Sequence, residues 1–154
     1  MKIPRHIQLE LFSAKPATNW DDRGPPVRGL IIRDPYITDI LLNRKVWEMR
    51  GMSTRIRGRI GLIKSQSGLV FGEAELTDVR GPLSYIELIE SWQVGPHDRE
   101  ELKQTGNVPY RHNDGSSRTF AWVLENVITY QPPVSYRHPS GAITFVDLKR
   151  ALDS

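Results

Sequence analysis

Short apolar segments, most of them too short for a helix, dominate the pattern of hydrophobic and polar positions along the chain. Residues 46–50 are expected to form a strand in which Val46, Glu48 and Arg50 share one face, and the two residues between them lie on the other. The SQSG sequence between residues 59–65 and 69–79 predicts a turn, and these two runs are expected to form a hairpin. The predicted strands are residues 29–33, 46–50, 59–65, 69–79, 120–130 and 142–148, with a further short strand in 1–12.

Three helices are predicted from the spacing of apolar residues and from capping signals. Asp34 and Pro35 are typical of a helix start, and apolar residues three and four positions apart follow them. Ser84 and Glu87 have the spacing of a capping box, in which each residue bonds to the other's backbone N–H. The predicted helices are residues 35–44, the turns that follow residue 84, and residues 98–106.

The domain organisation follows from where the regular pattern begins. Residues 1–28 are rich in proline and lack periodicity, so they are expected to form an extended arm or linker. Residues 29–154 are expected to form one domain, since a chain of this length has the size of a single domain. Strands and helices do not alternate regularly. This favours an α+β fold, a small and partly closed β-barrel with two or three short helices at its ends.

The composition excludes several classes of protein. The chain has no cysteine, which rules out disulfides, thiolate nucleophiles and iron–sulfur sites. Its four histidines are scattered without metal-ligand spacing, so no metal site and no other cofactor is expected. No apolar run approaches the length of a membrane span, and the N-terminal stretch is interrupted by charges. A cytoplasmic protein with no membrane partner is therefore expected.

The charge is unevenly distributed along the chain. Residues 44–59 hold six basic residues and one acid, a net charge of +5. Residues 73–101 hold eight acids and two arginines, a net charge of −6. A basic segment that includes a strand and the following loop is a candidate phosphate-binding surface. Alternatively, its arginines are solvated at a sheet edge or pair with the acidic stretch.

Two tryptophans near basic residues could either bind a base or belong to the core. Trp47 lies inside the basic segment, and Trp122 lies near other basic residues. Such side chains can stack on nucleobases, which contributes about 1–3 kcal/mol per base. Each of these tryptophans also lies in a predicted strand, where it could instead belong to the core.

Lys45 lies at the junction between the first predicted helix and the strand that carries Glu48 and Arg50. If Lys45 is still on the turn, its side chain can approach Glu48 and stays charged. A buried lysine without such a partner has its pKa lowered toward that of a base. An arginine and a carboxylate on one strand face could hold a polar ligand or form an ordinary ion pair.

The segment RGLIIRDPYITDILLNRKVWEMRG, followed by RGRIGLIKS and GLVFGEAELTDV, resembles the ASCH domain family. The block formed by Lys45, Glu48 and Arg50 matches the family pattern, and Asn43 stands where glycine is common. The resemblance covers residues 29–79, and the segments in 120–148 are similar to the closing strands of the family. It implies a β-barrel similar to the PUA domain, with a central cleft, and an association with RNA binding.

The same resemblance implies a possible activity. Some ASCH-like proteins act on RNA or on modified nucleosides, and one branch is similar to a small amidohydrolase that deacylates acetylated cytidine. That branch uses a lysine, a threonine three residues later and a distant glutamate. Lys45 matches the lysine, but Glu48 stands in the place of the threonine. Glu48 cannot serve as the same nucleophile.

Three hypotheses follow, and the first is a nucleic-acid-binding module for RNA or a nucleotide. In it, Trp47 or Trp122 stacks on a base and Glu48 accepts a hydrogen bond from a base or ribose. Arg137, in the loop before the last strand, is a further candidate contact to phosphate. The cations expected to neutralise phosphates are Lys45, Arg50, Arg55, Arg57 and Arg59.

The second hypothesis is a hydrolase acting on RNA or a modified nucleoside from the same cleft. Lys45 would then be the base or an electrostatic stabiliser, and Glu48 a general acid or base. The third is a protein-interaction domain without catalysis, in which basic and acidic segments pair within or between chains. The sequence leaves the oligomeric state open.

Overall fold

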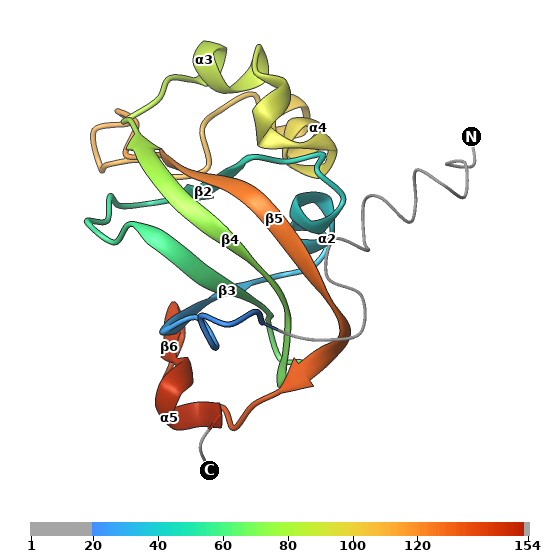
Figure 1. Ribbon diagram of the computed structural model, residues 1–154. Coiled ribbons are helices and arrows are strands. Elements are labelled where there is room, and N and C mark those ends of the chain that lie inside the picture. The colour runs from blue at the N-terminus through green and yellow to red at the C-terminus, as the bar shows by residue number, and fades with distance from the viewer. Residues whose placement is uncertain (1–19, 153–154) are drawn as a thin grey trace, which may run out of the picture.

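The computed structural model describes residues 20–152, which form one curled six-stranded sheet with short helices around it (Figure 1). The strand order is β2-β5-β4-β3-β1-β6. The strands are β1 (Arg28–Ile32), β2 (Trp47–Arg50), β3 (Gly58–Lys64), β4 (Leu69–Arg80), β5 (Phe120–Ser135) and β6 (Phe145–Asp147). The helices are α2 (Tyr36–Leu41), α3 (Tyr85–Ile89), the 3-10 turn η1 (Trp92–Val94), α4 (Pro96–Thr105) and α5 (Leu148–Leu152).

The sheet is mixed and bends into a half-barrel. β3 and β4 form the expected hairpin, and β4 pairs antiparallel with β5 along most of its length. β1 pairs in parallel with β3. The chain between these two strands runs through α2 and through β2, which lies at the far edge of the sheet. Register shifts interrupt both the β3–β4 and the β4–β5 pairs. Such bulges increase the local bend and twist of a sheet, which accounts for the curl.

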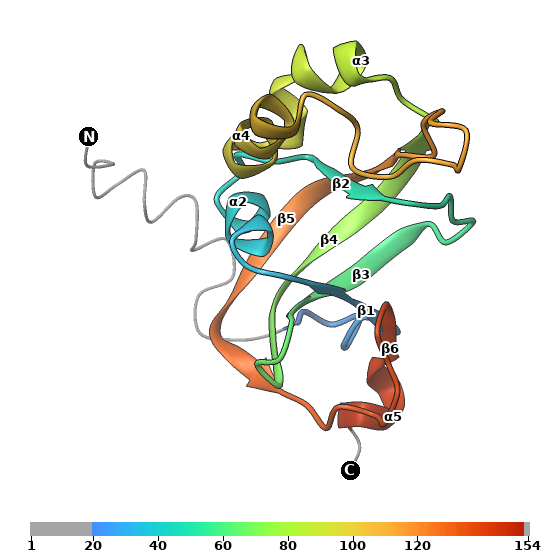
Figure 2. The same cartoon turned by 180° about the vertical axis from the view of Figure 1, so that it is seen from behind.

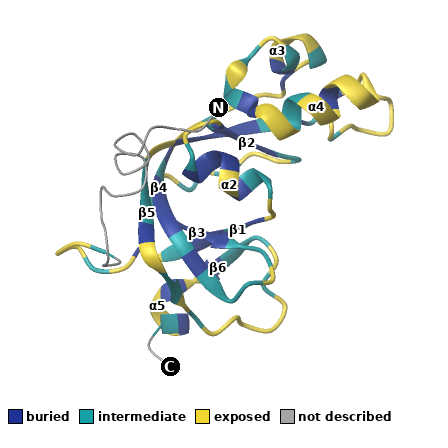
Figure 3. Cartoon of the chain, turned by 90° about the vertical axis from the view of Figure 1, so that its right-hand side faces the viewer, coloured by how far each residue is buried: buried dark blue, intermediate teal, exposed yellow. Residues whose placement is uncertain are grey.

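The helices close the open sides of this half-barrel. α2 lies within the curl of the sheet, between β1 and β2, while α3 and α4 lie together at one end (Figure 2). α5 lies at the opposite end, next to β6. Buried positions follow the strands and α2, whereas α3 and α4 carry exposed positions on their outer sides (Figure 3). The largest apolar cluster joins α2 to the inner face of the sheet, through residues that include Ile37, Ile40, Leu62 and Leu124.

The capping signals in the sequence are largely confirmed. Ser84 and Glu87 form the reciprocal capping box at the start of α3. α4 ends at Gly106, which adopts a left-handed φ of 68° that glycine tolerates without strain. The start of α2 differs from the prediction. Asp34 makes no capping bond to the helix backbone, and its carboxylate instead accepts a hydrogen bond from the Thr38 hydroxyl.

The predicted α+β half-barrel is confirmed, with two local differences at its ends. The strand predicted over residues 142–148 is limited to β6, and its last residue opens the unpredicted helix α5. The strand predicted in 1–12 lies outside the described residues, as does most of the predicted arm. In the described part of that arm, Trp20 packs edge-on against Tyr130, and the ring centroids lie 5.9 Å apart.

Within residues 20–152, no helix combines the length and the apolar character needed to cross a bilayer. In the same part of the chain, no group of three or more His, Asp or Glu side chains is arranged to hold a metal ion.

Tyr130 on β5 is the centre of a buried hydrogen bond with an expected pH dependence. Its hydroxyl donates to Glu73 Oε1 at 2.6 Å, and burial together with this bond raises the tyrosine pKa. The folded state therefore retains a proton that the unfolded chain releases above pH ~10. We therefore expect the free energy of unfolding of the wild type to decline above that pH. For Tyr130→Phe, the free energy measured by urea unfolding between pH ~9 and ~11 should decline less steeply. Equal slopes of the free energy of unfolding against pH in the wild type and Tyr130→Phe would contradict this. Tyr85→Phe is the control and should keep the wild-type slope.

Candidate functional site

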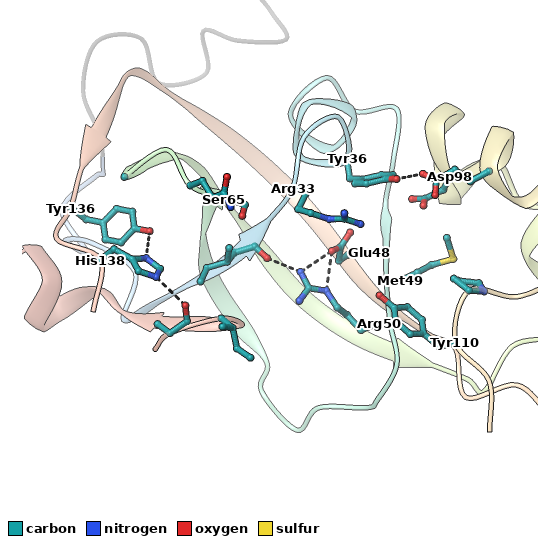
Figure 4. Close-up of a pocket in the computed structure, with 17 residues that line it drawn as sticks. Arg33, Tyr36, Glu48, Met49, Arg50, Ser65, Asp98, Tyr110, Tyr136 and His138 are labelled. Atoms are coloured by element: carbon teal, nitrogen blue, oxygen red, sulfur yellow. Dashed lines mark hydrogen bonds and ion pairs between the residues drawn. The ribbon is translucent and has the colours of Figure 1, made fainter. Parts of the chain in front are cut away.

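A cavity of about 760 Å³ opens beside the carboxyl end of β1, between α2, β2 and α4. Its walls come from segments far apart in the sequence, including the β3–β4 turn and the loop after β5 (Figure 4). Polar and aromatic side chains predominate among its lining residues, which include Arg33, Tyr36, Glu48, Arg50, Ser65, Gln66, Asp98, Glu101, Tyr110, Tyr136 and His138. The cavity is therefore suited to a polar ligand with a flat ring.

An ion pair on β2 forms the floor of this cavity. The Arg50 Nε and Nη2 atoms lie 2.9 and 2.8 Å from Glu48 Oε2. Nη2 also donates to the Ile31 carbonyl at 2.8 Å, and the guanidinium lies 5.6 Å above the Trp122 ring. These contacts hold both charged groups in fixed positions. Since both Arg50 nitrogens lie close to Glu48 Oε2, Oε1 is the oxygen left to accept a bond from a ligand.

Lys45 lies beneath this floor rather than in the cavity. Its side chain is 0% exposed, and Nζ donates to the Trp47 carbonyl at 2.5 Å and to the Val94 carbonyl at 3.0 Å. The third donor bonds to Asp98 Oδ2. An ammonium group has three donors, so all are used. Glu48 Oε1, at 3.8 Å from Nζ, is close enough for charge attraction but too far for a hydrogen bond.

Carboxylates from α4 form the acidic wall of the cavity. Burial raises the pKa of Asp98, and the nearby Lys45 ammonium only partly opposes this effect. Glu101 accepts a hydrogen bond from the Tyr36 hydroxyl, which fixes the Tyr36 ring at the rim. Arg33 projects toward the centre of the cavity, opposite Glu48 (Figure 4). Its guanidinium lies 5.7 Å over the Tyr36 ring, and we find no carboxylate paired with it in residues 20–152.

The comparisons with known proteins place this half-barrel in a family. The family model described as the ASCH domain matches residues 30–134, which is more than half of the chain. The chain belongs to the ASCH domain family. The resemblance noted in the sequence is thereby confirmed, and with it the PUA-like fold, which is associated with RNA binding.

Solved structures agree with this assignment. The crystal structure of ASCH from Zymomonas mobilis matches with a TM-score of 0.55 at 12% identity, and the match covers 82% of this chain and 90% of that chain. A point variant of the same protein matches with a TM-score of 0.53 at 13% identity, covering 80% and 90%. Another matches with a TM-score of 0.51 at 14% identity, covering 70% and 74%. At these identities the likeness shows the fold alone. The comparison with curated proteins found no relative.

The two tryptophans predicted to stack on bases are buried in this ASCH domain. Trp47 is 6% exposed and packs among apolar residues beneath α3 and α4. Trp122 is 2% exposed, and its indole N–H donates to the Met52 carbonyl. Neither ring offers a face to a base, which corrects the stacking expectation and favours the core reading of both residues. Alternation along a strand predicts two faces but not which of them is covered.

The predicted cations are divided between several environments. Arg59 makes a bidentate ion pair with Glu73, at 2.7 and 2.8 Å, so its charge is neutralised within the sheet. Arg57 donates twice to nearby backbone carbonyls and, like Arg55, lies in the exposed segment after β2. Arg137 is exposed between two residues that line the cavity. Of the predicted site residues, only Glu48 and Arg50 line the cavity itself.

Two lining residues, in the segment just after β1, were not selected from the sequence. Arg33 and Tyr36 follow β1 directly, so their place at the end of a predicted strand was the available signal. Tyr110 and His138 lie in loops, where no periodic pattern indicates which way a side chain points. The two loops meet at the cavity only because β5 and its neighbours bring them together.

Proposed function

We propose that this ASCH domain binds single-stranded RNA, or a nucleotide, in the cavity above β2. One observation carries the proposal: a cation with no carboxylate partner among residues 20–152, a fixed carboxylate acceptor and partly exposed tyrosine rings converge on one open cavity. Single-stranded RNA is recognised through these three types of contact, since its bases are free to stack and to present their edges.

Aromatic side chains supply the surfaces for a base. Tyr36 stands at one side of the cavity and Tyr110 at another, with the Glu48–Arg50 pair between them (Figure 4). The Tyr36 ring is fixed by its hydroxyl bond to Glu101, so little side-chain entropy is lost when a ligand packs against it. These tyrosines take the role that the sequence suggested for the tryptophans.

The polar groups supply directional contacts. Glu48 is oriented by Arg50, and its Oε1 can accept a hydrogen bond from an exocyclic amine or a ribose hydroxyl. Arg33 is exposed and has no carboxylate partner in the described part of the chain, so it can approach a phosphate without first breaking an ion pair there. Arg55, Arg57 and Arg137 stay predicted phosphate contacts outside the cavity.

The environment of Lys45 argues against its use as a catalytic base. Its three donors bond to two carbonyls and to Asp98, and its side chain is 0% exposed and does not line the cavity. The Lys45 nitrogen is therefore committed to the protein and cannot reach a ligand in the cavity. We therefore assign Lys45 a structural role, which leaves the binding function as the one the site supports best.

Arg33→Gln is expected to weaken binding of a fluorescent single-stranded RNA about fivefold to tenfold, because one phosphate contact is lost. The slope of log affinity against log salt should become shallower by about 0.7. Both quantities are measured by fluorescence anisotropy at salt concentrations from about 50 to about 200 mM. The control is Arg150→Gln, an exposed arginine on α5 that does not line the cavity.

The result expected for Arg150→Gln is unchanged affinity. If wild-type protein binds no RNA and no nucleotide at low salt, the proposed function is wrong. If both variants weaken binding equally, the protein attracts RNA through its overall charge, and the cavity is not the binding site.

A further inference from the structure

A second hollow, of about 480 Å³, adjoins the first cavity. It is formed by the long loop between α4 and β5, and it shares Pro109 and Tyr110 with the first cavity. Its other lining residues are Asn107, Arg111, His112, Asn113, Gly115 and Arg118. The Tyr110 ring thus stands at the boundary between the two spaces, at the loop side of the first cavity (Figure 4).

The two spaces differ in charge. The first cavity contains Glu48, Asp98 and Glu101 among its lining residues. The lining residues of the second hollow include two arginines and a histidine but no carboxylate. Asp114 is in the same loop, but its carboxylate accepts bonds from the Ser116 backbone and hydroxyl, within its own turn. The second hollow is therefore electropositive and suited to an anion.

Arg118 is the fixed cation of this hollow. Nη1 donates to the Gly51 carbonyl at 2.8 Å and Nε donates to the Arg111 carbonyl at 3.2 Å, while the guanidinium lies 5.6 Å from the centre of the Tyr110 ring. Both acceptors are neutral, and in the described part of the chain no carboxylate pairs with Arg118. These contacts fix the position of the Arg118 guanidinium but do not neutralise its charge. Arg59, paired with Glu73, is the opposite case.

Gly51 makes this position of Arg118 possible. A Cβ atom at Gly51 would lie 2.3 Å from Arg118 Nη1 and 2.9 Å from Tyr110 Cδ1, which is too close for either atom to stay in place. Gly51 directly follows Arg50 at the end of β2, so the fixed cation is attached to the strand that forms the floor of the first cavity.

We propose that the second hollow binds a phosphodiester group of the nucleotide next to the one held in the first cavity. The proposal rests on the proposed function and extends it: the ligand is a strand of at least two nucleotides that passes Tyr110. Three N–H groups of Arg118 stay available for phosphate oxygens, since a guanidinium has five and two are used. Arg111, exposed on the same loop, can contribute a second cation.

The test compares ligands of different length on one set of proteins. The probes are the four ribonucleoside 5′-monophosphates and the corresponding RNA homotetranucleotides, titrated by calorimetry or NMR. Arg118→Gln is expected to weaken tetranucleotide binding about tenfold, since a charge-assisted contact to phosphate is lost. Binding of the monophosphates should change less than about twofold, because these occupy the first cavity.

Gly51→Ala provides a matched variant that keeps the charge of Arg118 but displaces it. It should weaken tetranucleotide binding more than monophosphate binding, which changes only through the accompanying shift of Tyr110 at the edge of the first cavity. Unchanged tetranucleotide affinity in either variant overturns the proposed subsite. If that occurs while Arg33→Gln still weakens binding, the proposed function survives without the subsite. If wild-type protein binds neither class of probe, both proposals are wrong.

Discussion

Replacing Lys45 by methionine is expected to lower the free energy of unfolding by about 3–5 kcal/mol, the usual result of removing one partner from a buried ion pair. The side chain is 0% exposed, and its ammonium group joins β2 to the segment that contains η1 and α4. Without it, Asp98 and two backbone carbonyls lose their donor in a site that water does not reach freely. Urea unfolding of the wild type and the variant measures the difference.

The packing around the Lys45 stem adds to this expectation. Gly95 has a φ of 89°, and a Cβ atom at this position would lie 2.8 Å from Lys45 Cβ. The chain can pass this close to the Lys45 stem only because residue 95 is glycine. A methionine at position 45 fills the same space as the lysine stem but has no N–H donors. Lys103→Met, on an exposed position of α4, is the control and should change stability by less than about 0.5 kcal/mol.

A double variant separates the ion pair from other effects. Lys45→Met combined with Asp98→Asn removes both charges, and it should recover a large part of the stability lost in Lys45→Met alone. If Lys45→Met changes the free energy of unfolding by less than about 1 kcal/mol, Lys45 does not make the buried contacts described above. In that case its exclusion as a catalytic base would also have to be abandoned.

Glu73→Ala is the second substitution with a large expected effect, a loss of about 2–4 kcal/mol, because it leaves buried donors without an acceptor. Glu73 is 4% exposed and lies on β4. Its two oxygens accept the bidentate pair from Arg59 and the hydroxyl of Tyr130. Arg23 reaches the same carboxylate at 3.5 Å, which joins the segment before β1 to the sheet.

Glu75→Ala is the matched control for this substitution. Glu75 lies two residues further along β4, and its carboxylate accepts a bond from Asn126 at an exposed position. Exposed pairs of this kind contribute little, so the expected change is below about 1 kcal/mol. Thermal unfolding followed by circular dichroism distinguishes the two variants. Equal effects would show that the buried network around Glu73 does not stabilise the sheet.

The candidate site was predicted only in part, and β2 shows why. Alternation places Glu48 and Arg50 on one face, and the structure confirms this with a direct ion pair. The prediction succeeds because both residues lie on one strand, where geometry depends on immediate neighbours. The partner of Lys45 was not predictable, since Asp98 lies 53 residues away on a separate helix.

The arginines of the basic segment were likewise predicted only in part. The sequence leaves open whether its arginines face a ligand or the acidic stretch, and the structure gives different answers for different residues. Arg59 pairs with Glu73, although its partner in the strand register is Glu75. Arg59 and Glu73 thus meet diagonally across the two strands, and no pattern along a single strand reveals such a contact.

By itself, the sequence determined the α+β class, most strands, the hairpin, the capping box of α3 and the shared face of Glu48 and Arg50. These features depend on residues within a few positions of one another, so local periodicity and capping chemistry record them. The tertiary structure alone decided that both tryptophans are buried, that Lys45 is covered and that Arg33 and Tyr110 face a cavity. Burial and charge pairing depend on which distant segments meet when the sheet curls, and that arrangement is a property of the folded chain as a whole.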